Sequence, residues 1–165
     1  MTDATWTSPT AHDRLAILRR TRSVAILGMS AETSRPSHFV ATYLVSSSCD
    51  FDHVWFVNPR GGEILGRPVF TSLHELPGTP DLVDVFRRAD DLPGIAEEVA
   101  AIPGVGTLWL QLGLRNHDAA QIAHRAGKDV VMDRCLKIEH ARFAGGLHLA
   151  GFDTGVISSR RRPVL

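Results

Sequence analysis

The chain has 165 residues, a length that suits one domain with a single hydrophobic core. Apolar residues make up 44% and charged residues 22%, which is ordinary for a globular protein and excludes a disordered or fibrous class. Lysine plus arginine equals aspartate plus glutamate at 18 each, so no global field favours duplex nucleic acid or an anionic membrane, and any anion site must be local.

The sequence also carries no sign of export, a membrane span or a metal site. No apolar run approaches the roughly 20 residues that a membrane helix needs, and residues 1–10 lack the pattern of a signal peptide, so we expect a cytoplasmic protein. The two cysteines, Cys49 and Cys135, form no CxxC pair, and the eight histidines show neither HxxxH nor HExxH spacing. These patterns predict reduced thiols and no bound metal.

The first half of the chain alternates between helix and strand. A leading helix over 11–20 precedes a continuous apolar run over 24–27, which ends in Gly28 and is typical of a strand covered on both faces. A helix that begins at Pro36 comes next. A strand over 54–57 then stops at Asn58-Pro59, because proline cannot donate a hydrogen bond to the next strand.

The second half continues this alternation. We expect a turn over 60–62, strands over 68–70, 81–86, 107–112 and 130–132, and helices over 72–76, about 95–101, 118–126 and 136–141. Regular alternation of strand and helix implies right-handed crossovers. The sequence therefore predicts an α/β fold with a doubly wound, mainly parallel sheet and helices on both faces.

A ligand of such a sheet binds outside the carboxyl ends of the strands, where the strand order reverses beside the first strand. This rule points to the segment from Gly28 to Arg35, which offers backbone amides, hydroxyls and one guanidinium ahead of a helix N-terminus. An ordinary strand-to-helix turn explains Gly28 equally well, because glycine allows close packing.

The same region opposes NAD as the ligand. Ser30 and Thr33 stand where two glycines of the G-x-G-x-x-G fingerprint would be, and the second strand ends in Asn58-Pro59-Arg60 without an acidic residue for the ribose hydroxyls. Arg60 suits a phosphate instead, and both NADP and coenzyme A carry one on the adenosine ribose. The residues alone leave these two ligands open.

Two later strand ends carry further candidates for ligand contact. Arg87 and Arg88 follow the strand over 81–86 and can pair either with a pyrophosphate or with the acids at 90 and 91. Gln111, near the end of the strand over 107–112, can both donate and accept hydrogen bonds.

Cys135 and His140 are close in the sequence, and a thiol beside a histidine can act as a nucleophile. We favour a structural interpretation, in which Cys135 packs in the core, Asp133 caps the helix over 136–141 and Glu139 pairs with a neighbouring arginine. We therefore assign no catalytic residue.

An ordered set of segments, each weak alone, is specific when taken together. The segments are Val24–Ser30 with Arg35-Pro36-Ser37, Val57-Asn58-Pro59, Glu63–Gly66, Asp81–Arg88, Trp109–Gly113, and Val131–Cys135 with Lys137–His140. In this order they resemble the CoA-binding domain family, small proteins related to the cofactor-binding N-terminal domain of the succinyl-CoA synthetase α subunit. The resemblance spans about residues 22 to 142.

The resemblance implies a Rossmann-like fold with coenzyme A, free or acylated, lying across the strand ends. It places the pyrophosphate near the first loop, the adenosine phosphate near the second, and the pantetheine arm along the third. The candidate cofactor-binding residues are then Gly28, Met29, Ser30, Arg35 and Pro36; Val57, Asn58, Pro59 and Arg60; and Phe86 and Arg87, to which we add Arg88 and Gln111.

The resemblance supplies a ligand and not a reaction. The synthetase also needs a phosphohistidine loop and a nucleotide-grasping domain, for which this chain has no length. We therefore expect a CoA-binding module without evident catalytic machinery, which acts as a carrier, a sensor or a partner of a separate enzyme, or forms a homodimer. The alternatives are an NADP-dependent oxidoreductase or other nucleotide-using enzyme, and an interaction protein with a vestigial site.

This expectation divides the chain into three parts. Residues 1–21 are an N-terminal extension with a short helix, residues 22–142 are the CoA-binding domain, and residues 143–165 are a glycine-rich, basic tail. We interpret the run Ser158–Arg162 within that tail as a solvated extension.

Overall fold

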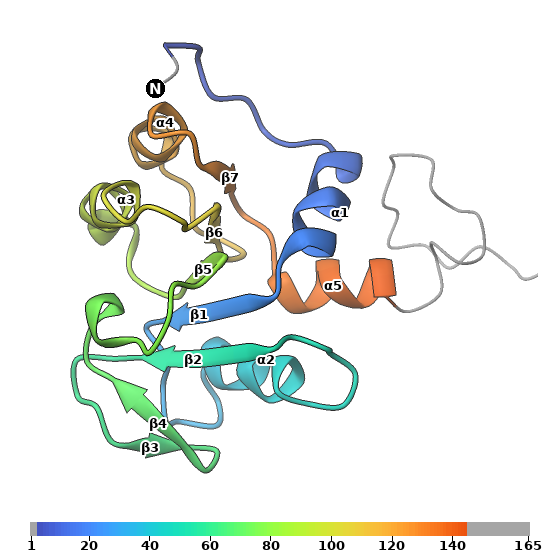
Figure 1. Cartoon of the computed structure of the whole chain (residues 1–165), viewed down its shortest axis with the longest axis vertical. Helices are drawn as coiled ribbons and strands as arrows, with labels where there is room; N and C mark the ends of the chain where they lie inside the picture. Colours follow the sequence, from blue (N-terminus) through green and yellow to red (C-terminus); the bar gives the residue numbers. More distant parts are fainter. Residues whose placement is uncertain (1–2, 145–165) are drawn as a thin grey trace, which may run out of the picture.

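The computed structural model describes residues 3–144, in which helices and strands alternate (Figure 1). The strands are β1 (Ser23–Leu27), β2 (His53–Val57), β3 (Glu63–Ile64), β4 (Arg67–Phe70), β5 (Leu82–Val85), β6 (Thr107–Leu110) and β7 (Asp129–Val131). The helices are α1 (Ala11–Arg20), α2 (Pro36–Leu44), α3 (Leu92–Ala100), α4 (His117–Arg125) and α5 (Leu136–Ala144), with short 3₁₀ turns η1 (Leu73–Glu75) and η2 (Ala89–Asp91). The run Ser158–Arg162 lies outside the described residues.

The strands form one sheet in the order β3-β4-β2-β1-β5-β6-β7. Every pairing is parallel except that of the short edge strand β3 with β4. The chain builds the sheet outward from β1 on one side and then returns to the other side of β1 at β5, so the strand order reverses between these two strands. This arrangement confirms the predicted doubly wound, Rossmann-like α/β fold.

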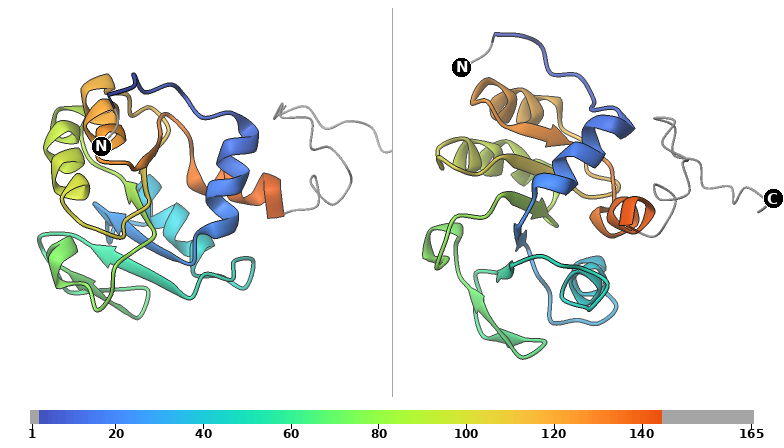
Figure 2. Two further views of the ribbon diagram at one scale, coloured as in Figure 1. Left: turned by 45° about the horizontal axis from the view of Figure 1, so that its top comes forward. Right: turned by 45° about the vertical axis from the view of Figure 1, so that its right-hand side comes forward.

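Successive side chains of each strand point to opposite faces of the sheet, so the hydrophobic core has two parts, one on each face. Ala25 and Leu108 pack in the cluster that includes residues of α3 and α4, whereas Val24, Ile26 and Trp109 pack with residues of α1, α2 and α5. Figure 2 shows the helices on both sides of the sheet. Because both faces are covered, residues 24–27 of β1 are all apolar instead of alternating between apolar and polar.

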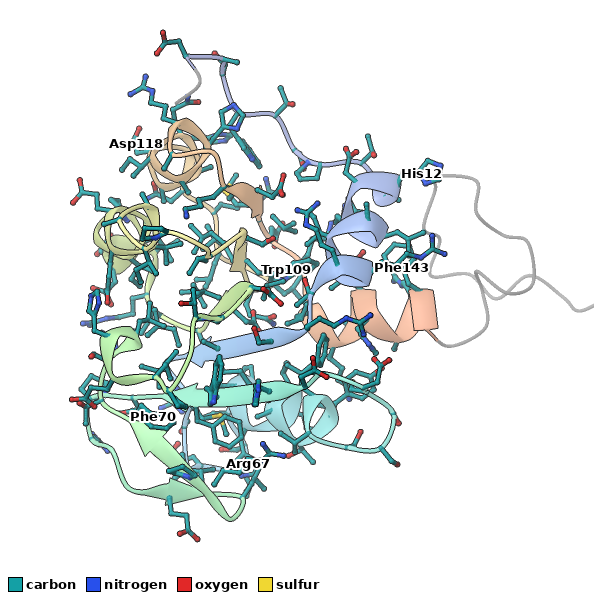
Figure 3. All side chains as sticks on the ribbon, in the orientation of Figure 1. His12, Arg67, Phe70, Trp109, Asp118 and Phe143 are labelled. Atoms are coloured by element: carbon teal, nitrogen blue, oxygen red, sulfur yellow. The ribbon has the colours of Figure 1, made fainter. Side chains whose placement is uncertain are left out.

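Trp109 is the largest of the fully buried side chains and lies near the middle of the molecule (Figure 3). Its indole Nε1 donates a hydrogen bond to the carbonyl oxygen of Arg134 at 2.8 Å. The bond satisfies the one polar group of the ring and fixes the segment that enters α5 against β6.

Several contacts hold the N-terminal segment against the sheet domain. Trp6 donates from its indole Nε1 to the carbonyl oxygen of Val130 in β7 at 3.1 Å. The buried Arg14 of α1 donates from Nε to Glu139 of α5 at 3.0 Å, and the guanidinium groups of Arg134 and Arg142 each lie 3.7 Å from the same carboxylate. These contacts pack α1 against α5.

Asp84 is an unusual residue for the centre of a parallel sheet. It lies in β5 between Ile26 of β1 and Trp109 of β6, it is fully buried, and neither carboxylate oxygen has a hydrogen-bond partner among residues 3–144. Burial raises the pKa of this carboxyl well above its usual value, because the charged form loses its hydration.

Candidate functional site

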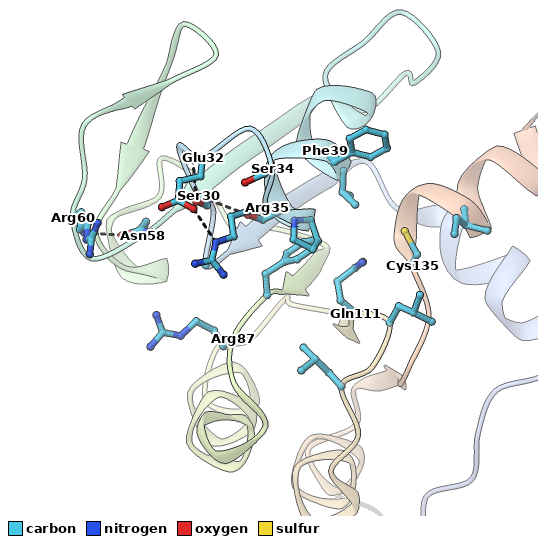
Figure 4. Close-up of a pocket in the computed structure, with 18 of the residues that line it drawn as sticks. Ser30, Glu32, Ser34, Arg35, Phe39, Asn58, Arg60, Arg87, Gln111 and Cys135 are labelled. Atoms are coloured by element: carbon cyan, nitrogen blue, oxygen red, sulfur yellow. Dashed lines mark hydrogen bonds and ion pairs between the residues drawn. The ribbon is translucent and has the colours of Figure 1, made fainter.

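A groove of about 890 Å³ lies at the point where the strand order reverses (Figure 4). It is bounded by the segments that follow β1, β2, β5 and β6, by the first half of α2 and by the start of α5 with the segment that leads into it. The groove therefore lies along the carboxyl ends of the parallel strands, where ligands of doubly wound sheets bind.

Gly28 sets the shape of the groove floor. Its φ of +90° favours glycine, and a Cβ there would come within 2.3 Å of the carbonyl oxygen of Phe86. The segment after β1 thus passes directly over the segment after β5. Any larger residue at position 28 would force the two segments apart.

The backbone amides of the first loop are already used within the protein. Gly28 and Met29 both donate to the carbonyl oxygen of Val57, at 2.9 and 3.1 Å, and the amide of Ser30 donates to the Ser37 hydroxyl at 3.0 Å. We expected amides of this segment to face a ligand. These three instead hold the loop to β2 and to the start of α2.

Asn58 joins the first and second loops. Its side-chain amide donates to the carbonyl oxygen of Met29 at 2.7 Å, and its side-chain oxygen accepts from the backbone amide of Arg60 at 2.9 Å. These two bonds place Arg60 at one end of the groove (Figure 4).

Three arginines line the groove, and they differ in their partners. Arg35 pairs with Glu32 at 3.0 Å, and Arg87 pairs with Asp91 at 3.4 Å. No carboxylate within residues 3–144 pairs with Arg60, whose side chain is exposed. The guanidinium of Arg60 is therefore available to an anionic ligand without breaking an ion pair.

The structure brings most of the predicted site residues together along this groove. Those that line it are Gly28, Ser30, Arg35, Pro36, Asn58, Pro59, Arg60, Phe86, Arg87 and Gln111. Three others do not. Met29 and Val57 are buried in the core, and Arg88 is 89% exposed and lies within 4.0 Å of Asp91.

The groove also has lining residues that the sequence did not single out as ligand contacts. Phe39 and Ile138 come from α2 and α5, Leu112 and Leu114 follow β6, and Cys135 precedes α5. A helical pattern of apolar residues predicts a buried face, so Phe39 and Ile138 gave no sign that they face a groove. Their exposure depends on the tertiary structure.

Gln111 takes the role that we predicted for Asp133. Its side-chain Oε1 accepts from the backbone amide of Leu136 at 3.0 Å and so caps the first turn of α5. Asp133 has a φ of +57° and instead accepts from the amide of Gly113 at 2.7 Å and from the guanidinium of Arg115. The expected Asp133 cap is therefore wrong, because that carboxylate is held by the loop after β6.

His140 contacts the other cysteine of the chain. Its Nδ1 lies 2.8 Å from the Tyr43 hydroxyl and 3.7 Å from the Cys49 sulfur. Burial raises the pKa of Cys49 to about 11 and that of Tyr43 to about 12, and it lowers the pKa of His140. The cluster therefore holds a protonated thiol at neutral pH, which is a poor nucleophile.

Residues 3–144 offer neither a metal centre nor a membrane-spanning helix. That part of the chain contains no group of three or more histidine, cysteine, aspartate or glutamate side chains placed to hold a metal ion. None of its helices is long and apolar enough to cross a membrane.

Both the sequence and the fold of the chain resemble those of known proteins. A family model described as a CoA binding domain matches residues 22–141. The Bacillus subtilis (strain 168) protein named "Uncharacterized protein YneT" is 36% identical over 134 residues, which are 81% of this chain and 96% of that protein.

Three solved structures resemble the chain. Cell-free ID.343 from Thermus thermophilus is 36% identical with a TM-score of 0.72, over 81% of this chain and 98% of that one. Prb, the PH1109 protein redesigned for binding, is 30% identical with a TM-score of 0.76, over 84% and 94%. The apo dinucleotide-forming acetyl-coenzyme A synthetase 1 of Ca. Korarchaeum cryptofilum, at 16% identity and a TM-score of 0.64 over 76% and 30%, shares the fold alone.

Proposed function

The chain belongs to the CoA binding domain family, and from that premise we propose that it binds coenzyme A in the groove at the carboxyl ends of the strands. It would serve as a carrier, a sensor or a partner of a separate enzyme, or act as a dimer of two copies. In this proposal the protein holds the cofactor and contributes no catalytic side chain.

The distribution of charge along the groove carries the proposal. Arg35, Arg60 and Arg87 line the groove, and coenzyme A presents a pyrophosphate and a ribose 3′-phosphate to such groups. Arg60 has no carboxylate partner in the described part of the chain, so we assign it to the 3′-phosphate. We assign Arg35 and Arg87 to the pyrophosphate, which would compete with their present partners Glu32 and Asp91.

The second loop also bears on the choice between coenzyme A and NAD. In NAD-binding folds an acidic residue at the end of the second strand holds the ribose hydroxyls, whereas β2 here is followed by Asn58, Pro59 and Arg60. Asn58 is engaged with Met29 and with the amide of Arg60. A ribose diol would therefore find no carboxylate at this end.

Calorimetric titration of the purified protein with coenzyme A, NADP and NAD tests the proposal. We expect coenzyme A to bind measurably more tightly than NAD, because Arg60 favours a phosphate and no acid favours the diol. NAD that binds as tightly as coenzyme A would overturn the proposal. NADP that binds more tightly than coenzyme A would favour the NADP-dependent alternative.

A further inference from the structure

Part of the groove wall is made of apolar side chains that remain exposed. Among residues 3–144, four large hydrophobic side chains are exposed, and three of them line this groove: Phe39 at 64%, Leu112 at 66% and Ile138 at 44%. They come from α2, the segment after β6 and α5. Three separate elements thus contribute exposed apolar side chains to the groove wall, and we call these three residues the apolar end.

Gln111 supplies an unused hydrogen-bond donor beside the apolar end. The residue is only 6% exposed and precedes Leu112 in the chain. Its Oε1 is occupied by the amide of Leu136, whereas its Nε2 has no partner within the described residues. The side chain points into the groove (Figure 4). A largely buried amide donor turned into a groove suits an acceptor oxygen on a ligand.

The apolar end and Arg60 lie at opposite ends of the groove. Figure 4 shows Arg60 and Asn58 on one side, and Phe39 and Cys135 on the other. If the 3′-phosphate lies at Arg60, as proposed above, an extended cofactor would place its sulfur toward Gln111 and the apolar end.

We infer that the apolar end receives the acyl chain of an acyl-CoA, and that Gln111 donates to the thioester carbonyl. The inference rests on the proposed function. Free coenzyme A ends in a thiol, whose sulfur is only a weak acceptor for Gln111. It also supplies no apolar chain to contact Phe39, Leu112 and Ile138. An acyl thioester of short to medium chain length supplies both, because its carbonyl oxygen accepts a hydrogen bond and its alkyl chain is apolar. The protein is then a binder of apolar acyl thioesters rather than of free coenzyme A.

Titration with coenzyme A and with acetyl-CoA, butyryl-CoA and hexanoyl-CoA tests this inference. Burying a methylene strengthens binding by roughly twofold to fourfold, depending on how completely water is excluded. We therefore expect hexanoyl-CoA to bind about tenfold or more tightly than acetyl-CoA. Equal affinities across the series would overturn the inference while leaving coenzyme A binding intact, whereas failure of all four to bind would overturn the proposed function itself.

Succinyl-CoA distinguishes an apolar chain from a charged one. The ammonium of Lys137 lies 4.0 Å from the centroid of the Phe39 ring, so a cation is present at this end of the groove. If apolar contact dominates, butyryl-CoA should bind more tightly than succinyl-CoA, which has the same chain length and a terminal carboxylate. Tighter binding of succinyl-CoA would contradict an apolar acyl site.

A matched pair of variants locates the effect. Ile138 and Leu65 are exposed to similar extents, 44% and 42%, but Leu65 lies in the turn between β3 and β4 and does not line the groove. We expect Ile138→Ser to weaken hexanoyl-CoA by about fivefold and coenzyme A by less than about twofold. Leu65→Ser should alter neither.

Two results with these variants would overturn the inference. One is an Ile138→Ser variant that binds both ligands as the unaltered protein does, or that weakens both equally. The other is evidence that the apolar end packs against a second copy of the chain instead of an acyl group. Sedimentation would then show that Ile138→Ser changes the oligomeric state, and the unaltered protein would show no dependence on acyl chain length.

Discussion

Arginine side chains occupy two contrasting settings in this molecule. Between α1 and α5, Arg14 is buried and donates to the equally buried Glu139 at 3.0 Å. At the groove, Arg35 has an exposed ion pair, Arg87 has a half-buried one, and Arg60 is exposed with no carboxylate partner in the described part of the chain. A buried and hydrogen-bonded arginine is committed to the fold, whereas an exposed one at a strand end keeps donors for a ligand.

Removal of the buried arginine should have the largest effect on stability. Arg14→Ala removes the 3.0 Å donor of the buried Glu139 but leaves Arg134 and Arg142 at 3.7 Å, so we expect the free energy of unfolding to fall by about 3 kcal/mol, the low end of the range for a broken buried pair. Urea unfolding followed by tryptophan fluorescence measures the change. Affinity for coenzyme A should stay within about twofold, because Arg14 does not line the groove.

Arg20→Ala is the matched control on the same helix. Arg20 pairs with Asp129, but both side chains are about half exposed, at 52% and 51%. Exposed pairs contribute about 0 to 1 kcal/mol. If Arg14→Ala and Arg20→Ala lowered the free energy of unfolding equally, burial of the Arg14 ion pair would not increase its contribution to stability.

Asp84 extends the comparison to a buried acid with no partner. The pKa of this carboxyl is higher in the folded protein than in the unfolded chain. At a pH between the two values, the folded state therefore keeps a proton on Asp84 that the unfolded state has released. Stability should therefore fall as the pH rises from about 4 toward the folded pKa, with a slope of at most about 1.4 kcal/mol per pH unit.

Asp84→Asn isolates this contribution, because the amide has the same shape and no charge. The variant should unfold at nearly the same urea concentration as the unaltered protein at pH 4, and at a higher concentration at pH 8. A parallel pH dependence of the two proteins would mean that Asp84 is ionised or solvated in the folded state.

The fold was largely predictable because its strands are covered on both faces. The predicted strands over 24–27 and 54–57 are apolar runs that end at Gly28 and Asn58-Pro59, and β5 is apolar except for Asp84. Their alternation with helices predicted a doubly wound parallel sheet but not its strand order. The edge strand β3 was not predicted, since its two residues are too few to show a period of two. α3 begins at Leu92, before the expected start at about 95, because Pro93 is tolerated in the first turn of a helix.

The candidate site was predictable only in part. The strand-end rule pointed to Gly28, Arg60 and Arg87, which line the groove. The apolar end was not predicted, because Phe39 and its buried neighbour Val40 are both apolar and their sequence does not say which one faces outward. Hydrogen bonding between distant segments, such as the cap of α5 by Gln111, has no local sequence signal at all.

The paired affinities of Arg60→Ala for coenzyme A and for dephospho-CoA test the central claim most directly. If Arg60 holds the 3′-phosphate, its charge-assisted hydrogen bonds contribute roughly 1.5 to 3 kcal/mol. Arg88→Ala is the control, because Arg88 is 89% exposed and does not line the groove. We predict that Arg60→Ala weakens coenzyme A about tenfold or more and hardly changes dephospho-CoA, while Arg88→Ala changes neither. Equal weakening of both ligands by Arg60→Ala, or no weakening of either, would contradict the account.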